Sequence, residues 1–192
     1  MASFTNATTR SSGYKITAAS DWNVVASSLN FVGSGTAGTG YPAVMATSSA
    51  TTALTANTWT SISFTTADEY DTATMHDVAT NPTRLTVPAS NGGLYSITAN
   101  VYASFFATAS YPMHLMVRKN AAGSTSGGTF VGIATSNSSQ VNVLGAGLNL
   151  HIETRLAAAD YIEIWVACET TSSVALNGAT YPHRFGLRWL ST

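Results

Sequence analysis

Apolar and polar side chains alternate with a period of two along most of the chain after residue 42. The alternation is clearest at residues 92–106 and 148–156. A period of two predicts strands that bury one face in a core. Shorter runs of the same pattern predict further strands at residues 59–64, 113–117, 129–135, 162–168 and 185–189. Many short strands with no helix between them predict an all-β fold: an antiparallel sandwich, a barrel or a jelly roll.

The N-terminal part follows a different pattern. Residues 1–16 are polar and predict an extended arm, after which Trp22, Val25 and Leu29 recur at three- and four-residue spacing. That spacing places the three side chains on one face of a short helix, which needs a partner to be stable, either sister copies or another protein. Residues 34–42 are rich in glycine and predict a linker.

These patterns divide the chain into three parts. We expect an arm and helix at residues 1–33, a linker at 34–42 and a β domain at 43–192. A length of 192 residues suffices for one domain with a real core and a short appendage, but not for two ordinary domains.

Charged side chains are scarce in this sequence. They make up 9% of the residues, against 45% for hydrophobic ones, and Ser, Thr, Ala, Asn and Gly fill the difference. Soluble domains usually carry about 25% charge, so this surface lacks much of the repulsion that keeps protein copies apart. Burial of part of the surface in an oligomer would resolve that deficit. The net charge of −1, without any run of Lys or Arg, predicts that the protein binds no nucleic acid.

The sequence also bears on the compartment in which the protein is made. Cys168 is the only cysteine, so the fold does not depend on an intramolecular disulfide. No segment reaches the roughly 20 apolar residues of a membrane span, and the N-terminus has no apolar export core. We therefore expect assembly in a cytoplasm, without membrane insertion.

Three motifs occur in order within the β region. Leu85–Pro88 is followed by Gly93-Leu94-Tyr95, so that a proline ends one strand and Gly-x-Tyr opens the next; Leu156–Ile164 and Arg184–Leu187 come later. The last two look like a Leu-x-x-Gly-Asp-x-Val-x-Leu hairpin and a closing Phe-x-Gly strand. Together the motifs resemble the C1q/TNF-like trimeric jelly rolls over roughly residues 43–190. The resemblance implies a jelly-roll β-sandwich that forms a homotrimer through aromatic and aliphatic side chains near a threefold axis.

One residue of the second motif departs from the family pattern. Residues 157–160 predict the turn of a hairpin that joins the strands at 148–156 and 162–168. Ala159 stands where the pattern has glycine. If the turn demands a positive φ at this position, the alanine is strained by roughly 1 kcal/mol or more.

A second resemblance concerns the N-terminus. Ile16-Thr17-Ala18-Ala19, followed by Trp22-Asn23 and the apolar helix, is similar to the start of bacteriophage fibre and decoration proteins. In those proteins the N-terminus attaches to the particle, which implies virion attachment to a capsid or tail protein through Trp22, Val25 and Leu29.

The two resemblances together imply a bacteriophage structural protein of the virion. It would be a homotrimeric, capsid-attached fibre or decoration protein that projects a C1q-like knob. The alternative is a tail-fibre or lectin-like module that recognises host surface glycans.

Acidic residues of one loop are the candidates for a metal site. Asp68, Asp71 and Asp77 cluster with Glu69 and His76 within ten residues and could supply oxygen ligands to calcium. The spacing matches no EF-hand, and Asp residues often bond the backbone of their own turn. We favour a loop network, in which His76 or Asp77 bonds backbone groups, over a metal site.

Neither catalysis nor a cofactor is expected. No Gly-x-Ser-x-Gly elbow is present, and the histidines at positions 76, 114, 151 and 183 are scattered. Tyr111 and Tyr181 are candidate receptor contacts, because these residues, like Trp59, Tyr102 and Trp165, could stack on sugar rings. The same aromatic residues could equally be core or trimer contacts.

Overall fold

The computed structural model of the chain describes residues 41–105, 112–137, 146–169 and 174–192. Every regular element within these ranges is a strand. The predicted arm and helix, with Trp22, Val25 and Leu29, lie outside the described residues, and so does Tyr111.

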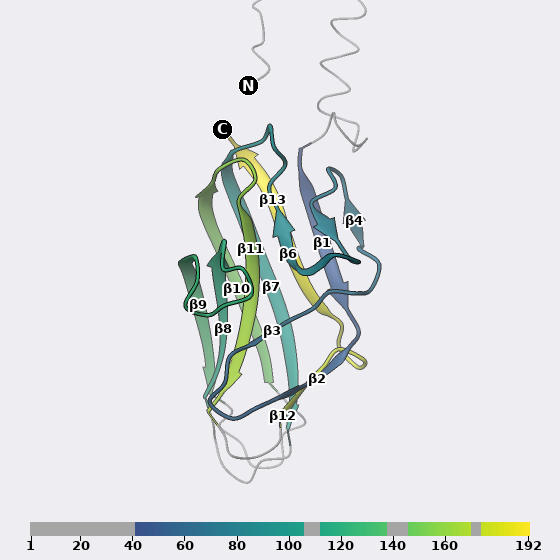
Figure 1. Cartoon of the computed structure of the whole chain (residues 1–192). Coiled ribbons are helices and arrows are strands. Elements are labelled where there is room, and N and C mark those ends of the chain that lie inside the picture. The colour runs from purple at the N-terminus through teal and green to yellow at the C-terminus, as the bar shows by residue number, and fades with distance from the viewer. Residues whose placement is uncertain (1–40, 106–111, 138–145, 170–173) are drawn as a thin grey trace, which may run out of the picture.

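The strands form two antiparallel sheets that lie face to face (Figure 1). Sheet A runs in the order β2-β12-β7-β13-β1-β4, and β10 pairs with β7. Its strands are β1 (Ala43–Ser48), β2 (Thr51–Leu54), β4 (Tyr70–Asp71), β7 (Gly93–Phe105), β10 (Ala146–Leu156), β12 (Val174–Asn177) and β13 (His183–Ser191). Sheet B runs in the order β5-β6-β11-β8-β9, and β3 pairs with β11. Its strands are β3 (Thr60–Ser61), β5 (His76–Asp77), β6 (Asn81–Thr86), β8 (Pro112–Lys119), β9 (Thr129–Asn137) and β11 (Tyr161–Cys168).

The long strand β7 organises sheet A. It pairs with β10 along one edge and with β13 and β12 along the other. Its alternating side chains Tyr95, Ile97, Ala99, Val101 and Ala103 are all buried, as the period of two predicted. They face the apolar side of β8 and β11, so the core lies between the two sheets.

The predicted antiparallel all-β fold is confirmed, together with most of its long strands. The segment 59–64 is strand only at Thr60–Ser61, although Ile62 and Phe64 are both buried in the core. In that segment the Phe64 amide donates to the carbonyl oxygen of Pro82 at 2.7 Å, outside any regular ladder.

The prediction of a hairpin between β10 and β11 is wrong. β10 pairs with β7 in sheet A, whereas β11 pairs with β6 and β8 in sheet B. Residues 157–160 therefore cross from one sheet to the other. Alternation reports which face of a strand is buried and does not reveal its partner, so two strands facing one core from opposite sheets look like a hairpin in sequence.

The crossing turn is fixed by hydrogen bonds to the end of the first motif. The Ala159 amide donates to Val87 O at 3.1 Å, and the Val87 amide donates to Asp160 O at 2.7 Å. Ala159 has a φ of 64°, so the left-handed conformation that the glycine of the family pattern would favour is present here with alanine.

Two motif glycines are required by close approach. A Cβ on Gly93 would collide with the carbonyl oxygen of Ser191 and lie 2.7 Å from Trp189 Nε1. A Cβ on Gly186 would lie 2.6 Å from Thr98 Oγ1 and 2.9 Å from the Met45 methyl group. Both glycines therefore let β13 pack closely against its surroundings.

The first described residues and the C-terminus lie at one end of the sandwich (Figure 1). Ala43 pairs with Arg188, and Tyr41 stacks on Trp189 with ring centroids 5.3 Å apart. β11 ends and β8 begins at the opposite end. Among the described residues no helix has the length and apolarity to cross a bilayer.

Candidate functional surfaces

The acidic loop is held together by its own carboxylates. Asp71 accepts four hydrogen bonds of 2.8–3.1 Å from the backbone amides of Ala73, Met75 and His76, with Met75 reaching both oxygens. Asp68 Oδ1 lies 2.8 Å from Nδ1 of the buried His76 ring. These bonds use the carboxylates to shape the segment that connects sheets A and B.

Asp77 has the same kind of role in the next turn. Its Oδ1 accepts from the amides of Ala79 and Thr80 at 3.0 and 2.9 Å. The Thr80 amide first, and then the Ala79 amide, hold the pKa of Asp77 below its usual value. Within the described residues no group of three His, Cys, Asp or Glu side chains is placed to hold a metal ion.

The outer face of sheet A carries polar side chains from β7, β10 and β13. Its central row joins Gly186, Thr98 and His151 across three strands. Ser96 Oγ lies 2.9 Å from His151 Nε2, and the Asn100 amide donates to Asn149 Oδ1. These bonds connect β7 to β10, and they fix the side chains that this face presents.

Two tyrosines contact each other on the same face, where Tyr102 lies four residues beyond Thr98 along β7. Tyr181, 53% exposed, contacts the Tyr102 ring with centroids 4.4 Å apart. Partial burial, and then the proximity of Tyr181, raise the pKa of Tyr102. Of the two predicted receptor contacts, only Tyr181 belongs to the described residues, and its ring is accessible.

The outer face of sheet B has a buried carboxylate that serves the structure. Glu163 is 1% exposed and lies in register between Arg84 on β6 and Arg118 on β8. It accepts from Thr83 Oγ1 at 3.2 Å and from the Gly123 amide at 3.4 Å. Hydrogen bonds to neighbouring strand and loop thus compensate its burial.

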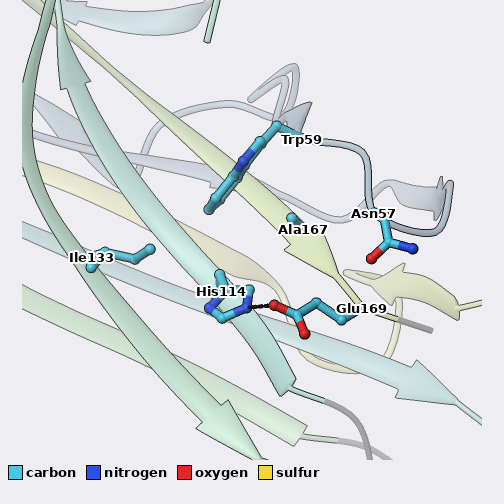
Figure 2. Close-up of a pocket in the computed structure, with 6 residues that line it drawn as sticks. All are labelled: Asn57, Trp59, His114, Ile133, Ala167 and Glu169. Atoms are coloured by element: carbon cyan, nitrogen blue, oxygen red, sulfur yellow. Dashed lines mark hydrogen bonds and ion pairs between the residues drawn. The ribbon is translucent and has the colours of Figure 1, made fainter. Parts of the chain in front are cut away.

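A hollow of about 230 Å³ lies farther along the same face (Figure 2). Strand register produces it, because Ala167 pairs with His114, while Trp59 directly precedes the residue that pairs with Val166. The small Ala167 is therefore flanked by two large rings, whose centroids lie 6.1 Å apart. The hollow is lined by Asn57, Trp59, His114, Ile133, Ala167 and Glu169. The sequence suggested Trp59 only as one of several aromatic residues that could stack on a sugar. The other five residues meet through strand pairing, which the sequence does not reveal.

His114 is fixed on both sides of its ring. Nδ1 lies 3.0 Å from Thr135 Oγ1, and Nε2 lies 2.9 Å from Glu169 Oε1. A hydroxyl, an imidazole and a carboxylate in this order are the groups of a hydrolytic triad. The hollow adjoins the carboxylate side of the ring, however, and Thr135 does not line it. The His114 imidazole therefore forms a wall of the hollow, and a substrate bound there would not lie next to the Thr135 hydroxyl.

Sequence comparisons give no relatives for this chain. A scan against family models matches none, and a search of curated proteins finds no match.

Solved structures do share its fold. The TNF protein Eiger from S. frugiperda superposes with a TM-score of 0.54 at 13% identity, covering 79% of this chain and 93% of Eiger. Murine APRIL gives 0.51 at 10% identity, covering 78% and 99%. The globular domain of zebrafish complement 1qA gives 0.47 at 9% identity, covering 79% and 99%. At these identities the likeness to Eiger and APRIL shows the fold alone: the chain is an antiparallel jelly roll of the C1q/TNF type, as the three motifs implied.

Proposed function

We propose that this chain is a non-catalytic structural protein of a bacteriophage virion. In this account it is a homotrimeric fibre or decoration protein whose residues 1–33 attach to the capsid and whose jelly roll projects outward. The observation that carries the proposal is the C1q/TNF-type jelly roll joined to an N-terminal segment that resembles those of phage fibre proteins.

The surface of the sandwich supports the homotrimer. The outer face of sheet A has a row without charge at Gly186, Thr98 and His151, between neighbouring rows that carry Arg184 on one side and Arg188 and Glu153 on the other. The Tyr102–Tyr181 pair lies farther along β7. The β9–β10 edge offers a second surface, where Phe130 is 53% exposed and the half-buried Leu150 and Ile152 pack against the core. Two different surfaces that meet head to tail close into a ring when the rotation permits.

The arrangement of the ends supports attachment and display. Residues 1–40 join the sandwich at Tyr41, beside the C-terminal strand. An attachment made through this segment leaves the opposite end of the sandwich farthest from the particle. Trp22, Val25 and Leu29 would contact a capsid protein or, if the chain is part of a tail fibre, a tail protein.

The second candidate function is recognition of host surface glycans by a tail-fibre or lectin-like module. The accessible Tyr181 ring favours it, since an exposed aromatic can stack on a sugar. In a homotrimer the same ring could instead contact a sister copy. Tyr181→Ala separates these roles: it weakens the trimer in one case and glycan binding in the other.

Deletion of residues 1–33 tests the main proposal. Every core residue in the described part of the chain lies after residue 42, so the shortened chain is expected to fold and trimerise. It should no longer co-sediment with phage particles that incorporate the full chain. If the shortened chain joins particles as well as the full chain does, the attachment role of residues 1–33 is wrong.

A further inference from the structure

We propose that the hollow on the outer face of sheet B is a binding site for one ring of a neutral saccharide. The inference concerns residues that are distinct from the acidic loop and from the Tyr102–Tyr181 pair. It does not depend on virion attachment, which is proposed for residues 1–33. Ile133 of the rim belongs to β9, so the hollow lies beside the β9–β10 edge and away from the outer face of sheet A.

The size of the hollow limits the ligand to a small one. Sites for drug-sized molecules usually enclose about 300–1,000 Å³. A volume of about 230 Å³ lies below that range and suits a single ring. A longer chain could enter only by placing one unit in the hollow and the rest in solvent.

The walls combine an apolar surface with hydrogen-bonding groups. Figure 2 shows Trp59 and Ile133 on one part of the rim and Asn57 and Glu169 on another, with Ala167 between them. The half-buried indole and the 45% exposed Ile133 provide apolar contact. A pyranose has the same two aspects, since its C–H face is apolar and its hydroxyls both donate and accept hydrogen bonds.

The polar groups of the rim are available to a ligand. Asn57 is exposed and held in place by its backbone, which donates to the carbonyl oxygen of Cys168 at 2.9 Å. Its side-chain amide, the indole N–H of Trp59 and the second carboxylate oxygen of Glu169 have no hydrogen-bond partner within the described part of the chain. Three N–H donors and two acceptor oxygens thus surround the apolar floor.

The electrostatics of the rim favour a neutral ligand. Glu169 is the one acidic residue among the six that line the hollow, and one of its oxygens is already bonded to His114. Sites for quaternary ammonium cations such as choline generally use a cage of several aromatic rings around the charge. Here a single indole and an imidazole that faces the carboxylate form the aromatic part.

The place of the hollow in the fold also suits ligand capture. The hollow lies where β11 ends and β8 begins, at the end of the sandwich opposite the first described residues and the C-terminus (Figure 1). The hollow therefore lies at the end farthest from the point where residues 1–40 join the sandwich.

Titration of the full-length ¹⁵N-labelled protein tests the site. The probes are methyl glycosides of glucose, galactose, mannose and N-acetylglucosamine, with choline chloride as the cationic comparison. The readouts are the indole N–H resonance of Trp59 and the backbone amide resonance of Ala167, which Trp59→Ala retains. We expect saturable shifts with at least one glycoside. Trp59→Ala should weaken its binding about tenfold or more. Asn57→Ala and Glu169→Gln, at exposed positions, should weaken it severalfold even if the tryptophan variant fails to fold.

Tyr70→Ala is the matched control, because it removes an exposed aromatic ring from β4 of sheet A, away from the hollow and from the Tyr102–Tyr181 pair. It should leave glycoside affinity unchanged. The proposal is overturned if no glycoside gives a saturable shift, if choline binds more tightly than every glycoside, or if Tyr181→Ala removes binding while Asn57→Ala and Glu169→Gln do not, which would place the sugar on the Tyr102–Tyr181 pair instead. Trimers that persist in the Glu169→Gln variant would show that a loss of sugar binding is separate from assembly.

Discussion

Replacement of Ala159 by glycine should stabilise the protein. Ala159 has a φ of 64°, in the left-handed region that costs a non-glycine residue about 1–2 kcal/mol. The hydrogen bond that its backbone amide donates to Val87 O holds the residue there, and its side chain is exposed, so the methyl group gives little packing in return. Glycine adds about 0.5–1 kcal/mol of chain entropy to the unfolded state. The net gain in the free energy of unfolding is therefore about 0.5–1 kcal/mol.

The neighbouring Ala158 provides the control. It is also exposed but keeps a negative φ, so Ala158→Gly carries only the entropy cost of about 0.5–1 kcal/mol. The two variants should differ by about 1–2 kcal/mol, or roughly 2–8 °C in melting temperature for a chain of this length. Scanning calorimetry at one fixed protomer concentration measures the difference. Equal melting temperatures for the two variants would refute the assignment of strain to Ala159.

Three further predictions concern buried or bonded groups. Burial raises the pKa of Tyr95 to about 12, so its contribution to stability should be constant below pH 10 and be lost as the pH rises toward 12. Tyr95→Phe, which also removes the 2.6 Å hydrogen bond to Asn91 O, should lose about 1 kcal/mol at neutral pH and show a smaller alkaline fall than the parent chain in a pH series of denaturant unfolding curves. Burial lowers the pKa of His183, so the folded state holds the neutral ring and should lose stability as the pH falls below 6.5. Melting curves of His183→Gln should show a smaller loss at acid pH than those of the parent chain, and equal losses would contradict this. Asp71→Ala removes the acceptor of four backbone hydrogen bonds and should lower the free energy of unfolding by about 2–3 kcal/mol. Urea titration should show a smaller loss for Asp77→Ala, because Asp77 is exposed.

The long strands could be predicted from sequence because burial imposes a period of two. β7 and β10 each bury one face in the core, and their side chains alternate accordingly. Shorter strands gave no such signal. β4 has two residues, and β6 includes Pro82 and buries only Leu85 fully. Such strands are defined by the partners they meet, which local composition does not record.

Pairing was the second limit. The β10–β11 hairpin failed because both strands face the same core from different sheets. The hollow on sheet B was invisible for a related reason. Trp59, His114 and Glu169 are separated by about fifty residues each and meet only because β3, β11 and β8 lie side by side in one register. The hydrogen-bond network of the acidic loop could be predicted more readily, since Asp71 and Asp77 accept hydrogen bonds from amides only a few residues away in sequence.

The mass of the native assembly tests the central claim most directly. A homotrimeric jelly roll predicts a species of three times 20.0 kDa for the full chain. Sedimentation equilibrium at micromolar protomer concentration should give that mass and no dependence on loading concentration. A stable species of 20.0 kDa under those conditions would contradict the trimer, and with it the account of this chain as a trimeric knob displayed on a particle.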